Sequence, residues 1–140
     1  MKPALEANRL SALQQRILIL LADLEPRWRL TGGGALGGFH LGHRETRNLD
    51  LFWSGQSRLG TWADEAERRL RDHGFRVEKI EDYPGFRRLR VVADSGATLV
   101  DLVADAVPWI REPMAVNLNG VDILVDHPYE STWSRPPRAS

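Results

Sequence analysis

Three strand-like segments in the second half of the chain are separated by very short turns. The segments cover residues 75–80, 86–93 and 98–104, and the turns between them read Asp82-Tyr83-Pro84-Gly85 and Asp94-Ser95-Gly96. Such turns cannot carry a chain to the start of a parallel neighbour, because a parallel crossover needs a dozen or more residues. The three segments are therefore predicted to form antiparallel hairpins.

Two further regions have the two-residue period of strands. Residues 48–53 alternate strictly, which places Asn48, Asp50 and Phe52 on one face of a strand. Residues 114–118 and 121–125 flank Asn119-Gly120, a pair typical of the type I′ turn of a β-hairpin. The sequence thus predicts two hairpin systems and one separate amphipathic strand.

Two helices are expected, the first from apolar residues spaced three and four apart and the second from its capping and charge pattern. The first covers residues 7–24 and stops at Pro26. The second covers residues 61–73, with Thr61 as its expected N-cap and Asp64 at the third position of a capping box. Its acidic and arginine residues stand four apart, so its charged side chains are expected to form a solvated face.

The order of these elements predicts an α+β domain with a mixed, largely antiparallel sheet flanked by helices. The chain has 140 residues, and the domain is expected to cover residues 1–127. Residues 128–140, rich in Pro, Arg and Ser, are expected to form a loose tail.

Composition narrows the available chemistry. The chain has no cysteine, which removes thiolate nucleophiles, redox switches and Cys-based metal sites. Nineteen basic and nineteen acidic residues balance, which argues against general coating of nucleic acid but allows a local phosphate site. We expect no membrane span and no leader segment, and hence a cytoplasmic protein.

The most unusual stretch is the glycine-rich run Thr31-Gly32-Gly33-Gly34-Ala35-Leu36-Gly37-Gly38. It follows a short extended segment at 27–31 and enters a short predicted helix at 35–41. Glycines at such a position let backbone N–H groups approach a phosphate, and the helix N-terminus adds partial positive charge. Two alternatives remain, namely a dinucleotide site of the G-x-G-x-x-G type and a tight turn that only packs a helix on a sheet.

Carboxylates form the second candidate site. Asn48 and Asp50 share a strand face about 7 Å apart, and Asp101 interrupts the apolar run ATLVDLVA. Burying this carboxylate requires compensation by an arginine, by backbone donors or by a divalent cation. If the two strands are neighbours, Asp50 and Asp101 could share one Mg²⁺; otherwise each aspartate has a structural role.

Two other clusters have weaker claims to chemistry. His40 and His43 lack a third ligand at zinc spacing, so a metal role for them is not favoured. Arg87, Arg88 and Arg90 form a basic patch that could face phosphate or nucleic acid, but the favoured interpretation is an exposed sheet edge protected by charge.

Residues 30–52, LTGGGALGGFHLGHRETRNLDLF, resemble the opening of AbiEii-type nucleotidyltransferases, abortive-infection toxins of the DNA-polymerase-β-like superfamily. Those proteins show Gly-Gly-Thr/Ser-Ala-Leu, then Leu-Gly-His-Arg, then Ser/Thr, then Asp-x-Asp-hydrophobic-Phe. The matching residues here are Gly32, Gly33, Ala35, Leu36, Leu41, Gly42, His43, Arg44, Thr46, Asp50, Leu51 and Phe52. Asp101 lies where the family's third carboxylate strand is expected.

The resemblance implies transfer of a nucleoside monophosphate from a nucleoside triphosphate to a hydroxyl on RNA, a nucleotide or a protein, and a toxin–antitoxin context. Gly32, Gly33 and Gly34, with Arg44 and Thr46, are implied to hold the triphosphate. The implied cofactor is Mg²⁺, or Mn²⁺.

In this scheme Asp50 and Asp101 are the catalytic carboxylates, and together with Asn48 they are the implied metal ligands. Two positions depart from the family pattern. Gly34 replaces a hydroxyl residue, and Asn48 replaces the first aspartate of Asp-x-Asp, which removes one negative charge from the implied metal site.

The C-terminal helical part of the family is expected to be lacking in this chain. A non-catalytic relative on the same fold, binding a nucleotide or a partner protein, is therefore the alternative function. An unrelated α+β nucleotide-binding or interaction module is a third hypothesis.

Overall fold

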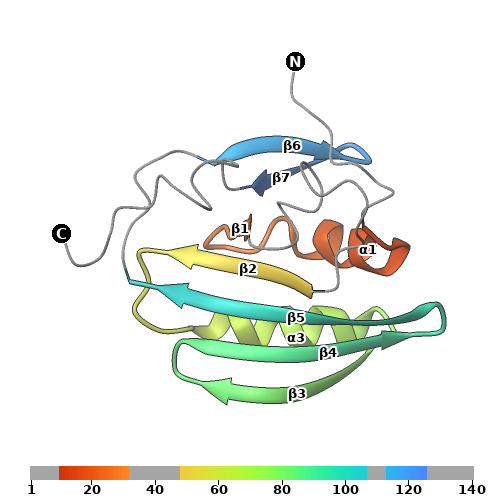
Figure 1. Cartoon of the computed structure of the whole chain (residues 1–140), viewed down its shortest axis with the longest axis horizontal. Coiled ribbons are helices and arrows are strands. Elements are labelled where there is room, and N and C mark those ends of the chain that lie inside the picture. Colours follow the sequence, from red (N-terminus) through yellow and green to blue (C-terminus); the bar gives the residue numbers. More distant parts are fainter. Residues whose placement is uncertain (1–9, 32–47, 107–112, 126–140) are drawn as a thin grey trace.

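The structure is a computed structural model and describes residues 10–31, 48–106 and 113–125. Within these ranges, seven strands form one sheet in the order β3-β4-β5-β2-β1-β7-β6, accompanied by two helices (Figure 1). The helices are α1 (Ala12–Leu21) and α3 (Thr61–Asp72). The strands are β1 (Arg29–Thr31), β2 (Asn48–Ser54), β3 (Arg76–Tyr83), β4 (Phe86–Ala93), β5 (Gly96–Asp105), β6 (Met114–Leu118) and β7 (Val121–Val125).

The sheet is mixed and mainly antiparallel. Strands β3 and β4, β4 and β5, β1 and β2, and β6 and β7 pair antiparallel, whereas β2 with β5 and β1 with β7 pair parallel. The predicted α+β class is therefore confirmed. The parallel pair β2/β5 is possible because α3 and the β3–β4 hairpin lie between these strands in the sequence, which gives a long crossover.

The short turns determine the strand boundaries well. Strands β4, β6 and β7 have the predicted bounds, and Asn119 and Gly120 adopt positive φ values of 52° and 88°, as a type I′ turn requires. Strand β3 continues to Tyr83, beyond the predicted end at residue 80, because Tyr83 pairs with Phe86 across the turn.

The helix starts differ from the predicted ones. Helix α1 begins at Ala12 rather than residue 7, because Ser11 and Gln14 form a capping box there. The predicted N-cap of α3 was wrong. Gly60 is the N-cap, with no side-chain cap hydrogen bond, and Thr61 is already the first helical residue.

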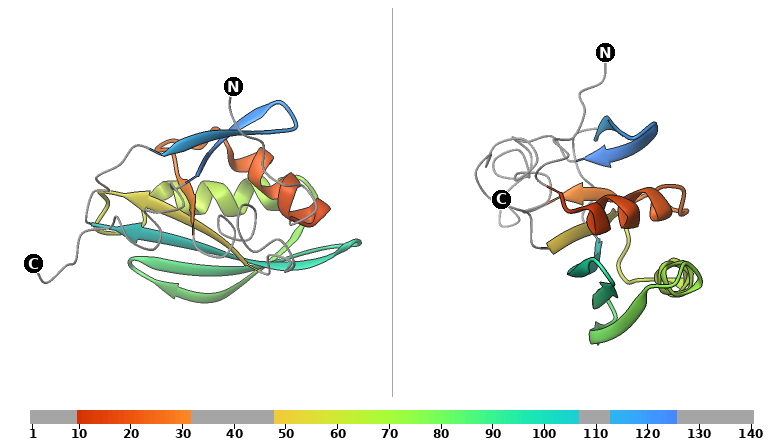
Figure 2. Two further views of the ribbon diagram at one scale, coloured as in Figure 1. Left: turned by 45° about the horizontal axis from the view of Figure 1, so that its top comes forward. Right: turned by 90° about the vertical axis from the view of Figure 1, so that its right-hand side faces the viewer.

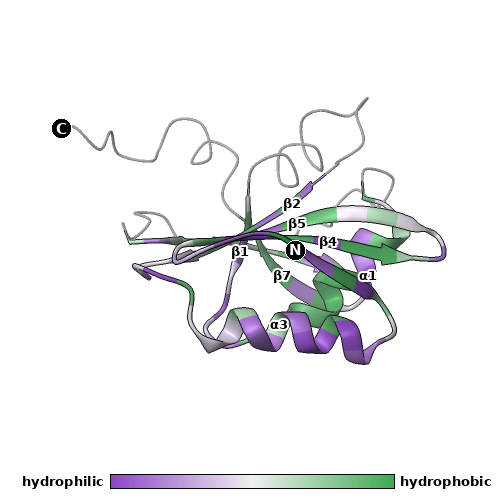
Figure 3. Cartoon of the chain, turned by 90° about the horizontal axis from the view of Figure 1, so that it is seen from below, coloured by the Kyte–Doolittle hydropathy of each residue, from purple (hydrophilic) through white to green (hydrophobic). Residues whose placement is uncertain are grey.

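Both described helices pack on the same face of the sheet, which we call the helix face (Figure 3). The alternating burial of β2 directs Leu49, Leu51 and Trp53 into the core on this face. From α1, Ile17 and Leu21 are fully buried in the same core. Figure 2 shows this layering from two further directions. Neither described helix combines the length and apolar character needed to cross a bilayer.

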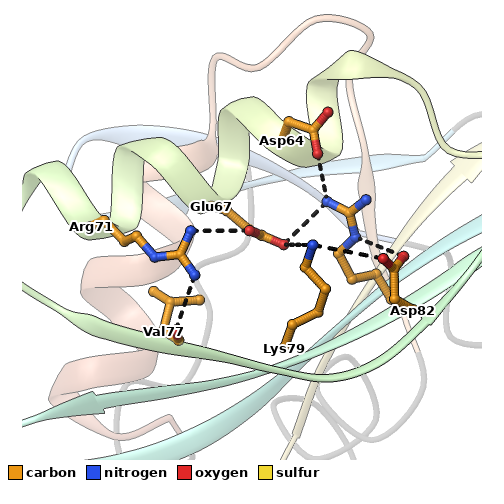
Figure 4. A network of polar contacts seen from close by, with 7 residues as sticks. Asp64, Glu67, Arg71, Val77, Lys79 and Asp82 are labelled. Atoms are coloured by element: carbon orange, nitrogen blue, oxygen red, sulfur yellow. Dashed lines mark hydrogen bonds and ion pairs between the residues drawn. The ribbon is translucent and has the colours of Figure 1, made fainter.

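The expectation that the charges of α3 are only solvated was partly wrong. Glu67 is 6% exposed and lies between α3 and the sheet (Figure 4). Its carboxylate contacts Arg71 at 3.2 Å, Arg87 at 3.2 Å and Lys79 at 3.7 Å. Packing α3 on the sheet forces this carboxylate out of water, and cations from two strands compensate it.

The arginine-rich strand is not a sheet edge, contrary to the favoured sequence interpretation. Strand β4 lies between β3 and β5, so its arginines are divided between two faces. Arg87 points to the helix face and contacts Asp64 and Glu67 of α3, whereas Arg88 and Arg90 lie on the opposite face. The three arginines therefore form no single patch.

The predicted short helix at 35–41 and the predicted tail at 128–140 lie outside the described residues.

Candidate functional site

The two candidate carboxylates lie side by side on neighbouring strands. Asp50 of β2 is directly opposite Asp101 of β5 in a parallel pair, so their side chains share a face of the sheet. Neighbouring strands are about 4.8 Å apart. The carboxylates face away from the helix face, because Leu49 and Leu51 on either side of Asp50 are buried there. The sequence allowed Asp50 and Asp101 to share a cation only if their strands were neighbours, and the structure shows that they are.

Asn48 belongs to the same group. It lies two residues before Asp50 on the same face, opposite Leu99 of β5. Its side chain therefore places an amide oxygen or nitrogen near the carboxylate pair. Both Asn48 and Asp50 are half-buried.

Asp101 is buried and bound by an arginine. The Arg88 guanidinium donates from Nε to Oδ1 at 2.8 Å and from Nη2 to Oδ2 at 3.0 Å. This is the two-bond geometry that makes arginine–carboxylate pairs strong. The Asp101 side chain is 7% exposed and the Arg88 side chain 31%. Of the three compensators considered for a buried aspartate, the salt bridge to arginine is present.

The pair is part of a polar row across five strands, on the face opposite the helices. In sheet order, the row consists of Glu81, Arg88, Asp101, Asp50 and Thr31, each directly opposite the next in register. Arg88 also donates from Nη1 to Glu81 Oε2 at 3.4 Å. We call these residues the polar row.

Charges of the row act on one another. Hydrogen bonding and charge from Asp101 raise the pKa of Arg88, with smaller contributions from Glu81 and Asp50 and with burial opposing them. Arg88 therefore stays a cation at every pH at which the protein is folded. Three carboxylates and one guanidinium leave the row with a formal charge of about −2.

The donor set suits a hard divalent cation. Asp50, Asp101 and Asn48 offer oxygen ligands on one face, and Mg²⁺ is commonly held by one or two carboxylates plus substrate phosphates. Each Asp101 oxygen keeps a lone pair beyond the one that Arg88 uses. Among the described residues no group of three or more His, Asp or Glu side chains could hold a metal ion.

The phosphate-binding half of the predicted site consists of the glycine run, Arg44 and Thr46. Gly32, Gly33, Gly34, Arg44 and Thr46 lie outside the described residues, as do His40 and His43. Strand β1 ends at Thr31, directly opposite Asp50, so the chain enters the glycine run beside the carboxylate pair.

Sequence reasoning missed the role of Arg88. The signal was available, because Arg88 and Arg90 alternate with buried Leu89 and Val91 and so share the face opposite the helices. The predicted burial of Asp101 also required a compensating group, and an arginine was one of the candidates. What the sequence did not reveal is that β4 and β5 pair in the register that places Arg88 opposite Asp101.

A separate depression lies at the far turn of the β4–β5 hairpin. It has a volume of about 450 Å³ and is lined by Arg16, His73, Phe75, Arg76 and Asp94, among others. The Arg16 guanidinium stacks on the Phe75 ring at 4.7 Å, which occupies that cation. This depression shares no residue with the polar row.

Comparisons with known proteins place the fold. No protein-family profile and no curated protein matches the chain. Among solved structures, a candidate nucleotidyltransferase from H. pylori matches 86% of this chain at 17% identity, with a TM-score of 0.52. JHP933 from Helicobacter pylori matches 90% of it at 16% identity, with a TM-score of 0.58.

This chain covers 55% and 53% of those two structures, about half the length of each. The AbiEii subfamily implied by the sequence resemblance is not distinguished by these matches. The chain has a nucleotidyltransferase-like α+β fold, and its polar row lies on the sheet of that fold.

Proposed function

We propose that the protein is a nucleotidyltransferase that moves a nucleoside monophosphate from a nucleoside triphosphate to an acceptor hydroxyl, with Mg²⁺ or Mn²⁺ as cofactor. The observation that carries the proposal is the register of Asp50 opposite Asp101 on parallel strands of a nucleotidyltransferase-like fold. The acceptor is RNA, a nucleotide or a protein, as the AbiEii resemblance of residues 30–52 implies.

Asn48 and three side chains of the polar row have distinct tasks in this reaction. Asp50 and Asp101 hold the cation, and Asn48 adds a neutral oxygen beside them. When bound, the cation supplies Lewis-acid stabilisation of charge on the transferring phosphoryl group. Arg88 holds the Asp101 carboxylate through two hydrogen bonds while the site is free of cation and nucleotide.

The triphosphate is assigned to the glycine run. Gly32, Gly33 and Gly34 directly follow Thr31, which lies opposite Asp50. Backbone N–H groups of such a run can donate to phosphate oxygens, and Arg44 and Thr46 add side-chain donors. We assign the reacting phosphate to the neighbourhood of the carboxylate pair, where β1 ends at Thr31.

The test is label transfer from each of the four nucleoside triphosphates, radiolabelled at the α-phosphate, with Mg²⁺ or Mn²⁺ and an RNA pool, nucleotides or protein as acceptor. Asp50→Asn is expected to lower transfer at least about 100-fold while the far-ultraviolet circular dichroism stays unchanged. Asp122→Asn on β7, remote from the row, is the matched control and is expected to retain activity. Label transfer that persists in Asp50→Asn would contradict the proposed mechanism.

A second candidate function is nucleotide binding without transfer. Asn48 supplies no charge and Arg88 neutralises Asp101, and both features reduce the negative charge available to a cation. In that case the wild-type protein binds a nucleoside triphosphate in calorimetry but gives no labelled product with any acceptor class.

A further inference from the structure

We infer that Arg88 is the resident counter-cation of the site. It holds Asp101 while the site is free, competes there with a divalent cation, and transfers its guanidinium to a nucleotide phosphate when cation and nucleotide bind together. The inference rests on the proposed function in one respect, the assignment of Asp101 as a cation ligand.

Competition follows from the geometry of the ion pair. Arg88 engages both Asp101 oxygens, at 2.8 Å and 3.0 Å, and so occupies the side of the carboxylate that it faces. A divalent cation on the same carboxylate must use the remaining lone pairs and lie close to a permanent positive charge. A divalent cation and a guanidinium that bind the same carboxylate in a half-buried site repel each other strongly. Arg88 therefore weakens the binding of a cation that arrives alone.

The two partners differ in their freedom to move. The Asp101 side chain is 7% exposed and belongs to a central strand, whereas the Arg88 side chain is 31% exposed. Its guanidinium lies 5.5 Å from the centre of the Phe86 ring and within 3.4 Å of Glu81. These contacts support the guanidinium when it leaves Asp101, because the aromatic face and the second carboxylate lie on the same side of the sheet.

A nucleotide phosphate is a chemically suitable second partner for the Arg88 guanidinium. Guanidinium pairs bidentately with phosphate as it does with carboxylate. If Arg88 exchanges Asp101 for phosphate, the carboxylate regains its full charge at the moment a cation is bound with the nucleotide. Cation and nucleotide then bind with positive coupling, and each raises the affinity for the other by the same factor.

The first experiment measures Mn²⁺ binding to the full chain by electron paramagnetic resonance, without nucleotide. Arg88→Gln is expected to bind Mn²⁺ at least about tenfold more tightly than the wild type. Arg90→Gln is the matched control, because Arg90 lies on the same strand and face but pairs with Glu78 at 3.0 Å. It is expected to leave Mn²⁺ affinity unchanged. Equal affinity in Arg88→Gln and the wild type, or no Mn²⁺ binding by Arg88→Gln, would overturn the inference.

The second experiment measures the coupling. Mn²⁺ titrations are repeated with a non-hydrolysable nucleoside triphosphate at saturation, for the wild type and Arg88→Gln. The nucleotide is expected to tighten Mn²⁺ binding at least about tenfold more in the wild type than in the variant. Equal tightening in both proteins would show that Arg88 does not exchange partners.

Folding of the variant is checked separately. If Arg88→Gln does not fold, Arg88→Lys retains a charge at the position but lacks the planar fork. It is then expected to bind free Mn²⁺ about threefold or more tightly than the wild type, and unchanged affinity contradicts the inference. The proposed function fails on a different readout, label transfer that is absent in the wild type or insensitive to Asp50→Asn, so the two failures are distinguishable.

Discussion

Arg88 and Asp101 form a two-bond ion pair in which only the carboxylate is deeply buried, with side-chain exposures of 31% and 7%. Removing the guanidinium and removing the carboxylate are therefore expected to lower the free energy of unfolding by different amounts. Arg88→Met leaves a buried carboxylate without its cation and is expected to lower the free energy of unfolding by about 3 kcal/mol. Asp101→Asn leaves Arg88 with Glu81 and solvent, and is expected to cost about 1 kcal/mol. Urea denaturation in EDTA measures both values. A larger cost for Asp101→Asn than for Arg88→Met would contradict this expectation.

Glu67 lies between α3 and the sheet with its side chain 8% exposed and with three cations around it. Glu67→Gln keeps the shape of the side chain but removes the charge that compensates Arg87, which is itself 12% exposed. We expect a loss of about 2 kcal/mol in the free energy of unfolding, because Arg87 keeps two exposed aspartates as partners. Glu78→Gln breaks an exposed pair of 60% and 47% side-chain exposure and is expected to cost less than about 0.5 kcal/mol. Equal midpoints in urea for the two variants would contradict this.

Asn48 shares a strand face with Asp50, and a carboxylate at position 48 would add a negative charge to the proposed cation site. Asn48→Asp is expected to raise Mn²⁺ affinity about fivefold or more in electron paramagnetic resonance titrations. Ser54→Asp adds the same charge at the far end of the strand, and is expected to have no such effect. Unchanged affinity in Asn48→Asp would mean that position 48 is not a ligand.

Gly120 has a φ of +88° in the β6–β7 turn, and a side chain at this position would meet nothing within 4 Å. The cost of Gly120→Ala is therefore conformational, and we expect about 1 kcal/mol in the free energy of unfolding. Asn119→Gly, at a φ of 52°, is expected to stay within about 0.5 kcal/mol of the wild type. Thermal denaturation of the two variants checks the difference, and identical melting temperatures would refute it.

Arg69 of α3 contacts Asp23, in the segment that follows α1, at 2.5 Å, and Glu65 at 3.1 Å. Hydrogen bonding to Arg69 lowers the pKa of Asp23 below its ordinary value of 3.8, and hydrogen bonding to Arg68 and then Arg69 lowers the pKa of Glu65 below 4.5. A carboxylate with a lowered pKa stabilises the fold above its unfolded-state pKa, and this contribution disappears as the pH falls through the folded-state value.

The urea midpoints of the wild type and Arg69→Gln are therefore expected to differ most above about pH 5 and to approach each other below about pH 3. A constant difference remains, because Arg69 also donates to the Leu20 carbonyl oxygen at 3.3 Å. Arg27→Gln, a minor influence on Asp23, should show little pH-dependent difference from the wild type. A gap for Arg69→Gln that is the same at pH 3 and pH 7 would speak against the carboxylates as its source.

The local pattern of the chain was sufficient for the hairpins and for the faces of individual strands. Alternation alone placed Asn48 and Asp50 on one face of β2, and Asn119-Gly120 alone predicted the turn that the backbone adopts. These features depend on residues that are neighbours in sequence, where the period of a strand and the φ preferences of glycine and asparagine decide the outcome.

Pairings between distant segments required the tertiary structure. Packing of the whole sheet against α1 and α3 decides which strand lies beside β2 and in what register. It also decides whether β4 is an edge strand. A shift of one residue between β4 and β5 would move Arg88 away from Asp101 and turn its side chain to the other face. The sequence by itself determined that a buried carboxylate at position 101 needed a partner, and the register of the β4–β5 hairpin makes Arg88 that partner. Only the fold brought Asp50 beside Asp101, because these two residues are far apart in the chain.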